Sequence, residues 1–326
     1  MQRPSVVFEM PDLTKPDEVV SEAEMEFFCE YGFLVKKALL DPDKLEYALD
    51  RIWAHLLAKV PVKPGSTWSL SRDDKQTWND PEWAEMSPHP VDGPFQGRHP
   101  IEHMRRVVKL HDLGSENYVL DLLPNDPRVR EVAKTILSGD LRASTRIRGV
   151  YIVFPSESVP DELEDQGRFL GPHTDQVCQQ LNACGYLEDV NARNGGFTLY
   201  PGSHKNMYRA HQYEANWSPL SSFRNALKEV AETIEPYEIV AEKGSVVFWH
   251  GRTVHSVGIH LGADIRWALF ADFTQNQPVL SDEEHKDVNQ YEWFKDAKLF
   301  RTDKPVGDDM WRSWRLGGYR VLLPSK

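Results

Sequence analysis

Short β-rich runs dominate the chain from about residue 141 onward, and they limit the folds open to it. The runs are rich in β-branched and aromatic residues and are separated by Gly, Pro, Asn and Asp. They read ASTRIRGVYIVF, VCQQLNACGYLEDV, GFTLYPGSH, EIVAEKGSVVFWH, VHSVGIH and IRWALFADF. Strands this short with turns this frequent predict an antiparallel sheet protein. Such a sheet is expected to close as a sandwich or double-stranded barrel, whose open mouth is the usual place for a small-molecule site.

The remainder of the chain flanks this β region. From Ser21 to Leu57 the pattern predicts a helix, a short extended piece and a second helix, with Ser21 and Asp41 as N-caps ahead of acidic first turns. Residues 60–100 are rich in Pro, Trp, Gly and Asp, which predicts long ordered loops. We expect a single domain, 1–326, with a helical and loop lead-in at 19–140, the β core at 141–280 and a C-terminal tail packed on the barrel at 281–326.

Composition narrows the class of partner. A formal charge of -12 and a pI near 5.5 disfavour a nucleic-acid partner, which would need a basic face, so we expect a small-molecule substrate. Three cysteines without a CxxC pair predict neither a disulfide framework nor a thiolate metal site, and they fit a reducing, cytoplasmic setting. The N-terminal stretch lacks the charged and apolar regions of a signal peptide. Nor does any stretch approach the roughly 20 apolar residues of a membrane span, so neither secretion nor membrane insertion is expected.

The segment GPHTDQ contains the first candidate metal ligands. His173 and Asp175 are two positions apart, so on an extended strand their side chains point to the same face. An iron(II) ion that must also bind an organic chelator and O2 takes two His and one carboxylate from the protein, with the other positions open. The sequence therefore predicts an iron(II) site whose third ligand comes from another strand.

Three histidines and two arginines, Arg252 and Arg266, lie downstream in EKGSVVFWHGRTVHSVGIHLGADIR. We predict His255 as the third ligand, with His250 as its rival at the end of an equally apolar run. Arg266 follows His255 by 11 positions (266 − 255), beyond a predicted turn. The cosubstrate 2-oxoglutarate chelates iron through one end and leaves its C5 carboxylate in need of a bidentate partner, which Arg266 would supply. The alternative is a structural ion pair between Arg266 and a protein carboxylate. His204 and His260 are expected to serve structure.

Four blocks of the sequence resemble the phytanoyl-CoA dioxygenase superfamily of iron(II) and 2-oxoglutarate enzymes. They are MEFFCEYGFLVKKALLDPDKLEYA, the HTD triplet at 173–175, NGGFTLYPGSHK, and GSVVFWHGRTVHSVG with Arg266 beyond it. Their order and spacing match over 19–273. The resemblance implies a double-stranded β-helix, a jelly-roll or cupin-like barrel, flanked by N-terminal helices. It also implies iron ligands at His173, Asp175 and His255 and the C5-carboxylate partner at Arg266.

Several positions depart from the family pattern. Pro172 stands where many members have Trp, Val257 where many have a hydroxyl residue, and Phe197 where some have Thr, so no cosubstrate role is transferred to Phe197. Two further residues are candidates for substrate or secondary cosubstrate contacts. Gln179 shares strand parity with Asp175, and Arg148 on the preceding strand can meet an acidic group.

The resemblance implies a reaction in which 2-oxoglutarate and O2 yield succinate and CO2 while a substrate C–H bond is hydroxylated. An intact Asp175 argues against a halogenase, which usually has Gly or Ala at that position. Desaturation, epoxidation and ring formation remain alternatives to hydroxylation. A cupin-like metal-binding isomerase or binding protein is the competing class, although it would have no reason to place an arginine at the cosubstrate distance. A non-enzymatic scaffold is the third alternative.

Overall fold

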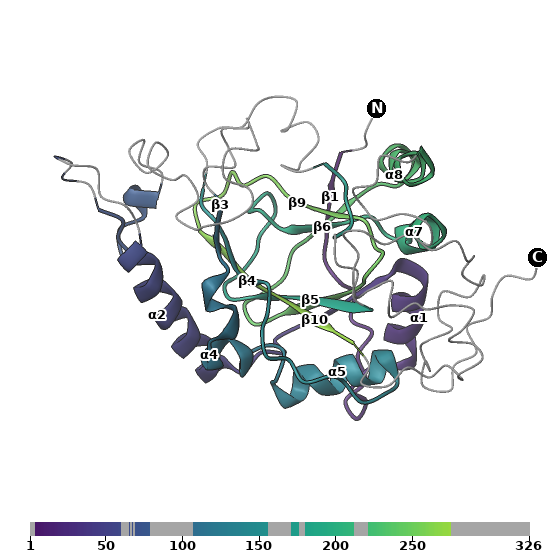
Figure 1. The fold of residues 1–326 in the computed structure, drawn as a ribbon, viewed down its shortest axis with the longest axis horizontal. Coiled ribbons are helices and arrows are strands. Elements are labelled where there is room, and N and C mark those ends of the chain that lie inside the picture. Colours follow the sequence, from purple (N-terminus) through teal and green to yellow (C-terminus); the bar gives the residue numbers. More distant parts are fainter. Residues whose placement is uncertain are drawn as a thin grey trace, which may run out of the picture.

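The computed structural model describes residues 4–59, 65, 67, 69–78, 107–155, 171–175, 180–211 and 221–274. Within these ranges the chain forms two sheets with helices around them (Figure 1). The predicted tail at 281–326, most of the predicted loops at 60–100 and Gln179 lie outside the described residues. No helix in the described part is both long and apolar enough to cross a membrane.

The N-terminal elements follow the sequence prediction. Helix α1 (Glu22–Tyr31) begins with a capping box, in which the Ser21 hydroxyl accepts from the Glu24 amide and the Glu24 carboxylate accepts from the Ser21 amide. It ends at Gly32, whose φ of 78° suits the left-handed cap. Strand β2 (Phe33–Lys36) follows, and α2 (Pro42–Lys59) begins where the Asp41 carboxylate accepts from the Lys44 amide at 3.1 Å. The predicted helix, extended piece and helix are confirmed, together with both caps.

All six predicted β-rich runs contain strands, arranged in two sheets. The six-stranded sheet has the order β2-β8-β5-β10-β4-β3, with β8 (Val246–His250), β5 (Leu181–Tyr186), β10 (Arg266–Phe273), β4 (Gly149–Val153) and β3 (Val107–Leu110). The four-stranded sheet has the order β1-β7-β6-β9, with β1 (Val6–Phe8), β7 (Tyr237–Ile239), β6 (Phe197–Leu199) and β9 (His255–Val257).

Two features differ from the sequence prediction of an antiparallel core that begins at residue 141. Strand β1 pairs with β7 in parallel, whereas the other strand pairs of both sheets are antiparallel. Strands β1, β2 and β3 all precede residue 141 and yet form outer strands of the two sheets. These strands span only three or four residues each, too few for a period-two pattern to stand out from the surrounding sequence.

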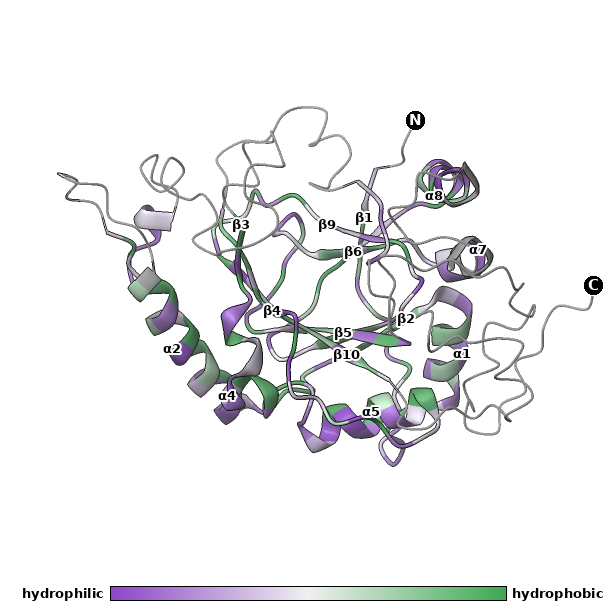
Figure 2. Cartoon of the chain, viewed as in Figure 1, coloured by the Kyte–Doolittle hydropathy of each residue, from purple (hydrophilic) through white to green (hydrophobic). Residues whose placement is uncertain are grey.

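Helices cover the outer face of the six-stranded sheet (Figures 1 and 2). The Trp267 ring, on β10, lies 4.7 Å from the Trp53 ring on α2, and the space beside Gly185 on β5 is filled by Leu40 and Leu123. Helix α5 (Pro127–Leu137) buries Val129, Val132, Ala133, Ile136 and Leu137, the three- and four-residue spacing of an amphipathic helix. The described residues also form α4 (Asn117–Leu120), α7 (Ser203–His211), α8 (Ser221–Thr233) and the 3-10 turns Lys75–Trp78 and Asp112–Ser115.

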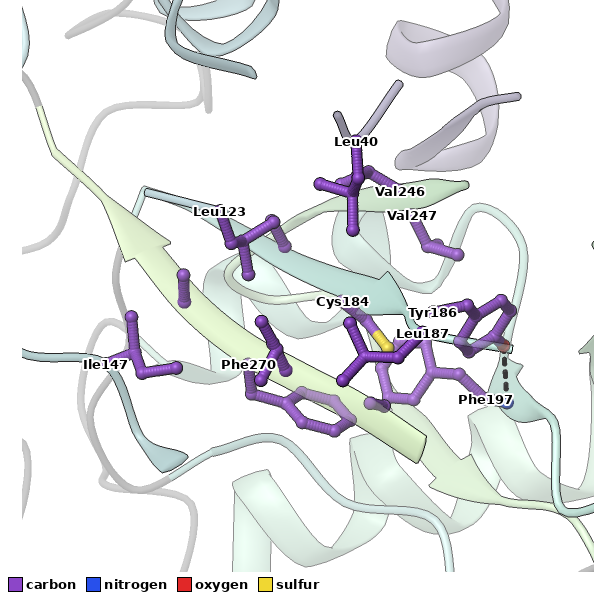
Figure 3. Close-up of a cluster of buried hydrophobic side chains, with 14 of the residues drawn as sticks. Leu40, Leu123, Ile147, Cys184, Tyr186, Leu187, Phe197, Val246, Val247 and Phe270 are labelled. Atoms are coloured by element: carbon purple, nitrogen blue, oxygen red, sulfur yellow. Dashed lines mark hydrogen bonds between the residues drawn. The ribbon is translucent and has the colours of Figure 1, made fainter. Parts of the chain in front are cut away.

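The inner faces of the two sheets pack against each other. The Phe197 ring of β6 lies 4.5 Å from the Trp249 ring of β8 and 5.7 Å from the Phe270 ring of β10. The Tyr186 side chain of β5 lies in the interior, where its hydroxyl accepts from the Phe197 amide at 2.9 Å (Figure 3). The same hydroxyl donates to the Ile239 carbonyl at 3.0 Å. Because side chains alternate along a strand, residues 266, 268, 270 and 272 of β10 share this inner face. Arg266 and Asp272 of β10 therefore face the interior between the two sheets.

Candidate metal centre

Backbone hydrogen bonds bring the two predicted histidine ligands together. The His173 amide donates to the His255 carbonyl at 3.1 Å, and the His255 amide donates to the His173 carbonyl at 2.9 Å. His173 makes this contact as an isolated bridge to β9. The two imidazole rings lie 4.6 Å apart as a result. One pair of backbone hydrogen bonds to β9 therefore positions the HTD triplet. The sequence had predicted a strand at this triplet, whereas the structure has an isolated bridge.

Asp175 completes a group of three candidate ligands. One ligand atom each from His173, Asp175 and His255 can be chosen so that all lie within 4.8 Å of one another. The Asp175 Oδ2 atom is 3.4 Å from His255 Nε2. Within the described ranges this is the group of His, Cys, Asp and Glu side chains whose spacing suits a metal ion.

The hydrogen bonds of both imidazoles favour a metal-binding tautomer. His173 Nδ1 lies 3.0 Å from the Gly171 carbonyl, and His255 Nδ1 lies 3.0 Å from the Thr253 carbonyl. A carbonyl oxygen only accepts, so each Nδ1 carries the proton and each Nε2 keeps its lone pair. Two Nε2 atoms and one carboxylate form a donor set that suits iron(II), with coordination positions left for other ligands.

Electrostatics favour the forms of these side chains that bind a divalent cation. Burial, with a smaller effect of the neighbouring His255, lowers the pKa of His173 to about 4, so the imidazole is neutral near pH 7. Burial alone would raise the pKa of Asp175. The Arg148 guanidinium and the two imidazoles outweigh burial and hold that pKa well below its usual value. A neutral imidazole and a charged carboxylate are the species that ligate metals.

The rival and structural histidines lie elsewhere. His250 is buried, its Nδ1 accepts from the Arg252 amide at 3.1 Å, and its ring packs 5.3 Å from His204. His204 Nε2 lies 3.1 Å from the Cys29 carbonyl. His260 is buried beside Gly195. The structure thus groups His255, and not His250, with His173 and Asp175.

Arg266 is a buried cation on the inner face of β10. Its side chain is in a residue only 4% exposed, Nε donates to the Gly195 carbonyl at 3.0 Å, and Nη1 donates to the Tyr151 carbonyl at 3.2 Å. Among the described residues, no carboxylate lies within ion-pair distance of this guanidinium. Burial lowers its pKa. The ion pair with a protein carboxylate, the alternative for Arg266 in the sequence analysis, is therefore not found in the described part of the chain.

Arg148, which the sequence predicts as a substrate or secondary cosubstrate contact, is hydrogen-bonded to three protein side chains. Its guanidinium donates to Asp175 at 2.5 Å, to the Asn182 side-chain oxygen at 2.9 Å and to both carboxylate oxygens of Asp272. These acceptors all belong to the protein. The guanidinium is thus engaged next to the candidate metal ligands. Gln179, the other candidate for such a contact, lies outside the described residues.

Asp272, Asn182 and an aromatic wall beside His255 were not predicted from the sequence. The wall consists of Phe197, Trp249 and Phe270, and the Phe197 and Trp249 rings lie 5.3 and 5.7 Å from the His255 ring. Strand parity with Arg266 was the signal for Asp272, because positions two apart on one strand face the same side. Asn182 needed the register of β5 against β10, which pairs it with Asp272 and which no local pattern contains.

Comparison with known proteins gives a family match over most of the chain. The family model described as phytanoyl-CoA dioxygenase (PhyH) matches residues 28–268. The human peroxisomal phytanoyl-CoA dioxygenase is 25% identical over 87 residues, which cover 27% of this chain. That alignment spans only 26% of the human protein, about a quarter of its length.

Solved structures with similar folds are distant in sequence. The epimerase SnoN in complex with Fe3+, alpha ketoglutarate and nogalamycin RO is 17% identical, with a TM-score of 0.49, and the match covers 78% of this chain and 83% of SnoN. EctD from S. alaskensis with 2-oxoglutarate and 5-hydroxyectoine is 17% identical, with a TM-score of 0.47, and the match covers 84% of this chain and 83% of EctD.

Proposed function

Because this chain belongs to the phytanoyl-CoA dioxygenase (PhyH) family, we propose that it is an iron(II)- and 2-oxoglutarate-dependent dioxygenase. The reaction we propose hydroxylates an unactivated C–H bond of a small-molecule metabolite and releases succinate and CO2. The family match confirms the resemblance seen in the sequence. We further propose that the two packed sheets are the two halves of a double-stranded β-helix, with the candidate metal centre at its mouth.

The donor set supports iron as the resident metal. His173 and His255 would bind it through Nε2 and Asp175 through a carboxylate oxygen, since these atoms lie within 4.8 Å of one another. Iron and 2-oxoglutarate together would supply the oxidising power that activates O2 toward a C–H bond. The carboxylate at position 175 favours oxygenation over halogenation, as the sequence had indicated.

Arg266 is the observation that carries the assignment of the cosubstrate. A buried guanidinium is costly when it lacks a counter-ion, and within the described residues only carbonyl oxygens of Gly195 and Tyr151 accept from it. A dicarboxylate cosubstrate would bring the missing negative charge and accept in the bidentate geometry that arginine prefers. A cupin-like binding protein without a dicarboxylate ligand would leave this charge uncompensated.

The aromatic wall suits a reaction that must exclude water. Phe197 and Trp249 lie beside His255, Phe270 packs against both of these rings, and all three residues are less than a tenth exposed. Apolar rings at this position would shield the reacting atoms from solvent and orient the target carbon. They would perform these roles without exchanging protons.

The first test is anaerobic addition of iron(II) and 2-oxoglutarate to the metal-free protein. A weak visible metal-to-ligand band is expected, because the cosubstrate would chelate the bound iron. His255→Ala should abolish the band, whereas His250→Gln, a change at the buried histidine outside the group, should retain it. Absence of the band in the unaltered protein would favour a cupin-like binding protein instead.

Succinate release in the presence of O2 tests turnover. A screen over amino acids, phosphonates, acyl-CoA esters and polycyclic metabolites should identify substrates that raise succinate release above the uncoupled background. Mass spectrometry of the product then tests the reaction type, since hydroxylation adds one oxygen and desaturation removes two hydrogens.

A further inference from the structure

Arg148 contacts Asp175, one of the three candidate metal ligands. Its backbone amide donates to the Phe270 carbonyl at 2.9 Å, which ties it to β10 just before β4 begins. The next residue, Gly149, has a φ of 126°, and a Cβ added there would lie 2.7 Å from the Leu110 carbonyl oxygen. Only glycine fits at this first residue of β4, so the backbone directly after Arg148 is constrained.

The guanidinium is held on two of its edges by groups that are not candidate ligands. Nε and Nη2 donate to the two carboxylate oxygens of Asp272, the fork-to-fork arrangement that orients an arginine plane. Nη2 also donates to the Asn182 side-chain oxygen at 2.9 Å. Asn182 is fully buried on β5, directly across from Asp272 on β10. The plane of the guanidinium is therefore set by β5 and β10.

The remaining edge of the guanidinium faces the candidate metal ligand. Nη1 donates to Asp175 Oδ2 at 2.5 Å, and that same oxygen lies 3.4 Å from His255 Nε2. The Arg148 contact therefore restrains the oxygen of Asp175 that faces His255.

We propose that Arg148 is a positioning residue for the metal: anchored by Asp272 and Asn182, it orients the Asp175 carboxylate toward the two histidines. It also separates the two carboxylates, since it lies between Asp175 and Asp272 and engages both. Asp272 is thereby occupied away from the metal, and the protein offers one carboxylate to the ion instead of two. This role depends on the metal site of the proposed function.

Arginine suits this role and lysine does not. One guanidinium can keep the two-bond fork to Asp272 while a separate N–H reaches Asp175, whereas an ammonium is a single point charge on a flexible stem. Partners of metal ligands typically change metal affinity by about 10- to 100-fold when they are altered. A merely structural ion pair would alter the thermal midpoint of the metal-free protein and leave the metal affinity of the folded protein unchanged.

The test measures binding of Co(II) alone to metal-free protein, by calorimetry and by the visible d–d spectrum, which reports the coordination of the ion. Arg148→Lys keeps the charge and should weaken Co(II) binding about tenfold or more and change the spectrum. Asp272→Asn removes half of the fork and should weaken binding by a smaller factor. Arg146→Lys is the matched control, because Arg146 is exposed, donates to His111 and Ser115, and should leave Co(II) binding unchanged.

The outcomes separate this inference from the proposed function. If the unaltered protein fails to bind Co(II), or if His255→Ala binds Co(II) as tightly as the unaltered protein, the proposed metal site is wrong. If the unaltered protein binds Co(II) and Arg148→Lys matches it within twofold with the same spectrum, the positioning role is wrong while the metal site stands. Should Arg148→Lys fail to fold, Asp272→Asn decides by the same twofold criterion.

Discussion

Two arginines face the interior between the sheets, and their surroundings are opposite. Arg148 contacts Asp175, Asp272 and Asn182, whereas Arg266 contacts only the carbonyl oxygens of Gly195 and Tyr151 within the described residues. Burial alone would lower both pKa values. The two carboxylates reverse this for Arg148 and raise its pKa well above the usual value, while the pKa of Arg266 is lowered.

This difference in hydrogen-bond partners suggests different roles for Arg148 and Arg266. A guanidinium that is paired inside the protein stabilises the structure and orients its partners. A buried guanidinium without a carboxylate leaves an unbalanced charge, which a dicarboxylate ligand can balance on binding. The four predictions that follow test this contrast between a paired arginine that builds the site and an unpaired arginine that binds a ligand.

The largest expected effect is on stability, and it should distinguish the two arginines. Arg148→Gln leaves Asp175 and Asp272 close together without their cation and should lower the free energy of unfolding by about 3 kcal/mol. This is the lower end of the range for a broken buried pair, because the Arg148 side chain is 21% exposed. Arg266→Gln removes an uncompensated charge and should cost less than about 1 kcal/mol. Urea unfolding of metal-free protein measures both, and equal losses would contradict the comparison.

The second prediction concerns cosubstrate affinity. Arg266→Gln should weaken binding of 2-oxoglutarate to the iron-loaded protein about 100-fold, or roughly 2.7 kcal/mol, because it loses the charge-assisted bonds to the C5 carboxylate. Co(II) affinity should stay the same, since Arg266 contacts none of the three candidate ligands among the described residues. Titration of the visible band measures the affinity. An unchanged affinity would show that another group holds that carboxylate.

The third prediction tests the loop that supports Arg266. Glu238 accepts from the backbone amides of Arg193 and Gly196, on either side of the Gly195 carbonyl that Arg266 contacts. Burial raises the pKa of Glu238 to about 7, although these amides and the Arg193 charge oppose it. The folded pKa thus exceeds the unfolded value near 4.5, so the protonated carboxyl is favoured in the folded protein.

The stability that Glu238 contributes is therefore complete below about pH 4.5 and is lost as pH rises through about 7. Relative to Glu238→Gln, which does not titrate, the unaltered protein should lose on the order of 1–3 kcal/mol of unfolding free energy between pH 5 and pH 8. Urea unfolding at both pH values measures the difference. A parallel pH dependence in the two proteins would mean that the carboxyl titrates normally.

The smallest expected effect comes from the glycine next to Arg266. Gly195 has a φ of 72°, so Gly195→Ala should destabilise the protein by about 1 kcal/mol. The added methyl would also press on His260 at 3.3 Å, displace the carbonyl that accepts from Arg266 and weaken 2-oxoglutarate binding a few-fold. Gly202→Ala is the matched control, because Gly202 has a φ of 76° and the nearest atom to its added methyl is the Glu30 carbonyl oxygen at 3.6 Å. Gly202→Ala should lower the free energy of unfolding by a similar amount and leave 2-oxoglutarate affinity unchanged. If both variants lose the same affinity for 2-oxoglutarate, Gly195 has no special role beside Arg266.

Local chemistry explains which parts of the fold were predictable. Ser21 and Asp41 accept backbone hydrogen bonds from residues within three positions, so their capping role is readable from neighbours in sequence. The β-rich runs were recognisable for the same reason. Strand β1 was not, because three residues that pair in parallel with β7, more than 200 positions away, have no local signature.

The candidate site divides in the same way. The sequence predicts the four candidate residues His173, Asp175, His255 and Arg266, because iron(II) and a dicarboxylate prefer these side-chain types in any fold. It does not predict the contacts of Arg148 with Asp175 and Asp272. Alternation along β4 would place Arg148 on the outer face with Val150, but Gly149, the first residue of β4, has a φ of 126°, which breaks the alternation between Val150 and Arg148.

Sequence alone therefore predicted the helix caps and the residue types of the candidate site, since a cap depends on groups a few positions apart and His173 and Asp175 stand in one triplet. Tertiary structure alone decided which arginine is paired and which is open to a ligand. That distinction depends on the register of β5 and β10, which brings Asn182 and Asp272 to Arg148 and leaves Arg266 among backbone carbonyls. Strand register is a long-range property, set by the packing of whole sheets, and no short stretch of sequence contains it.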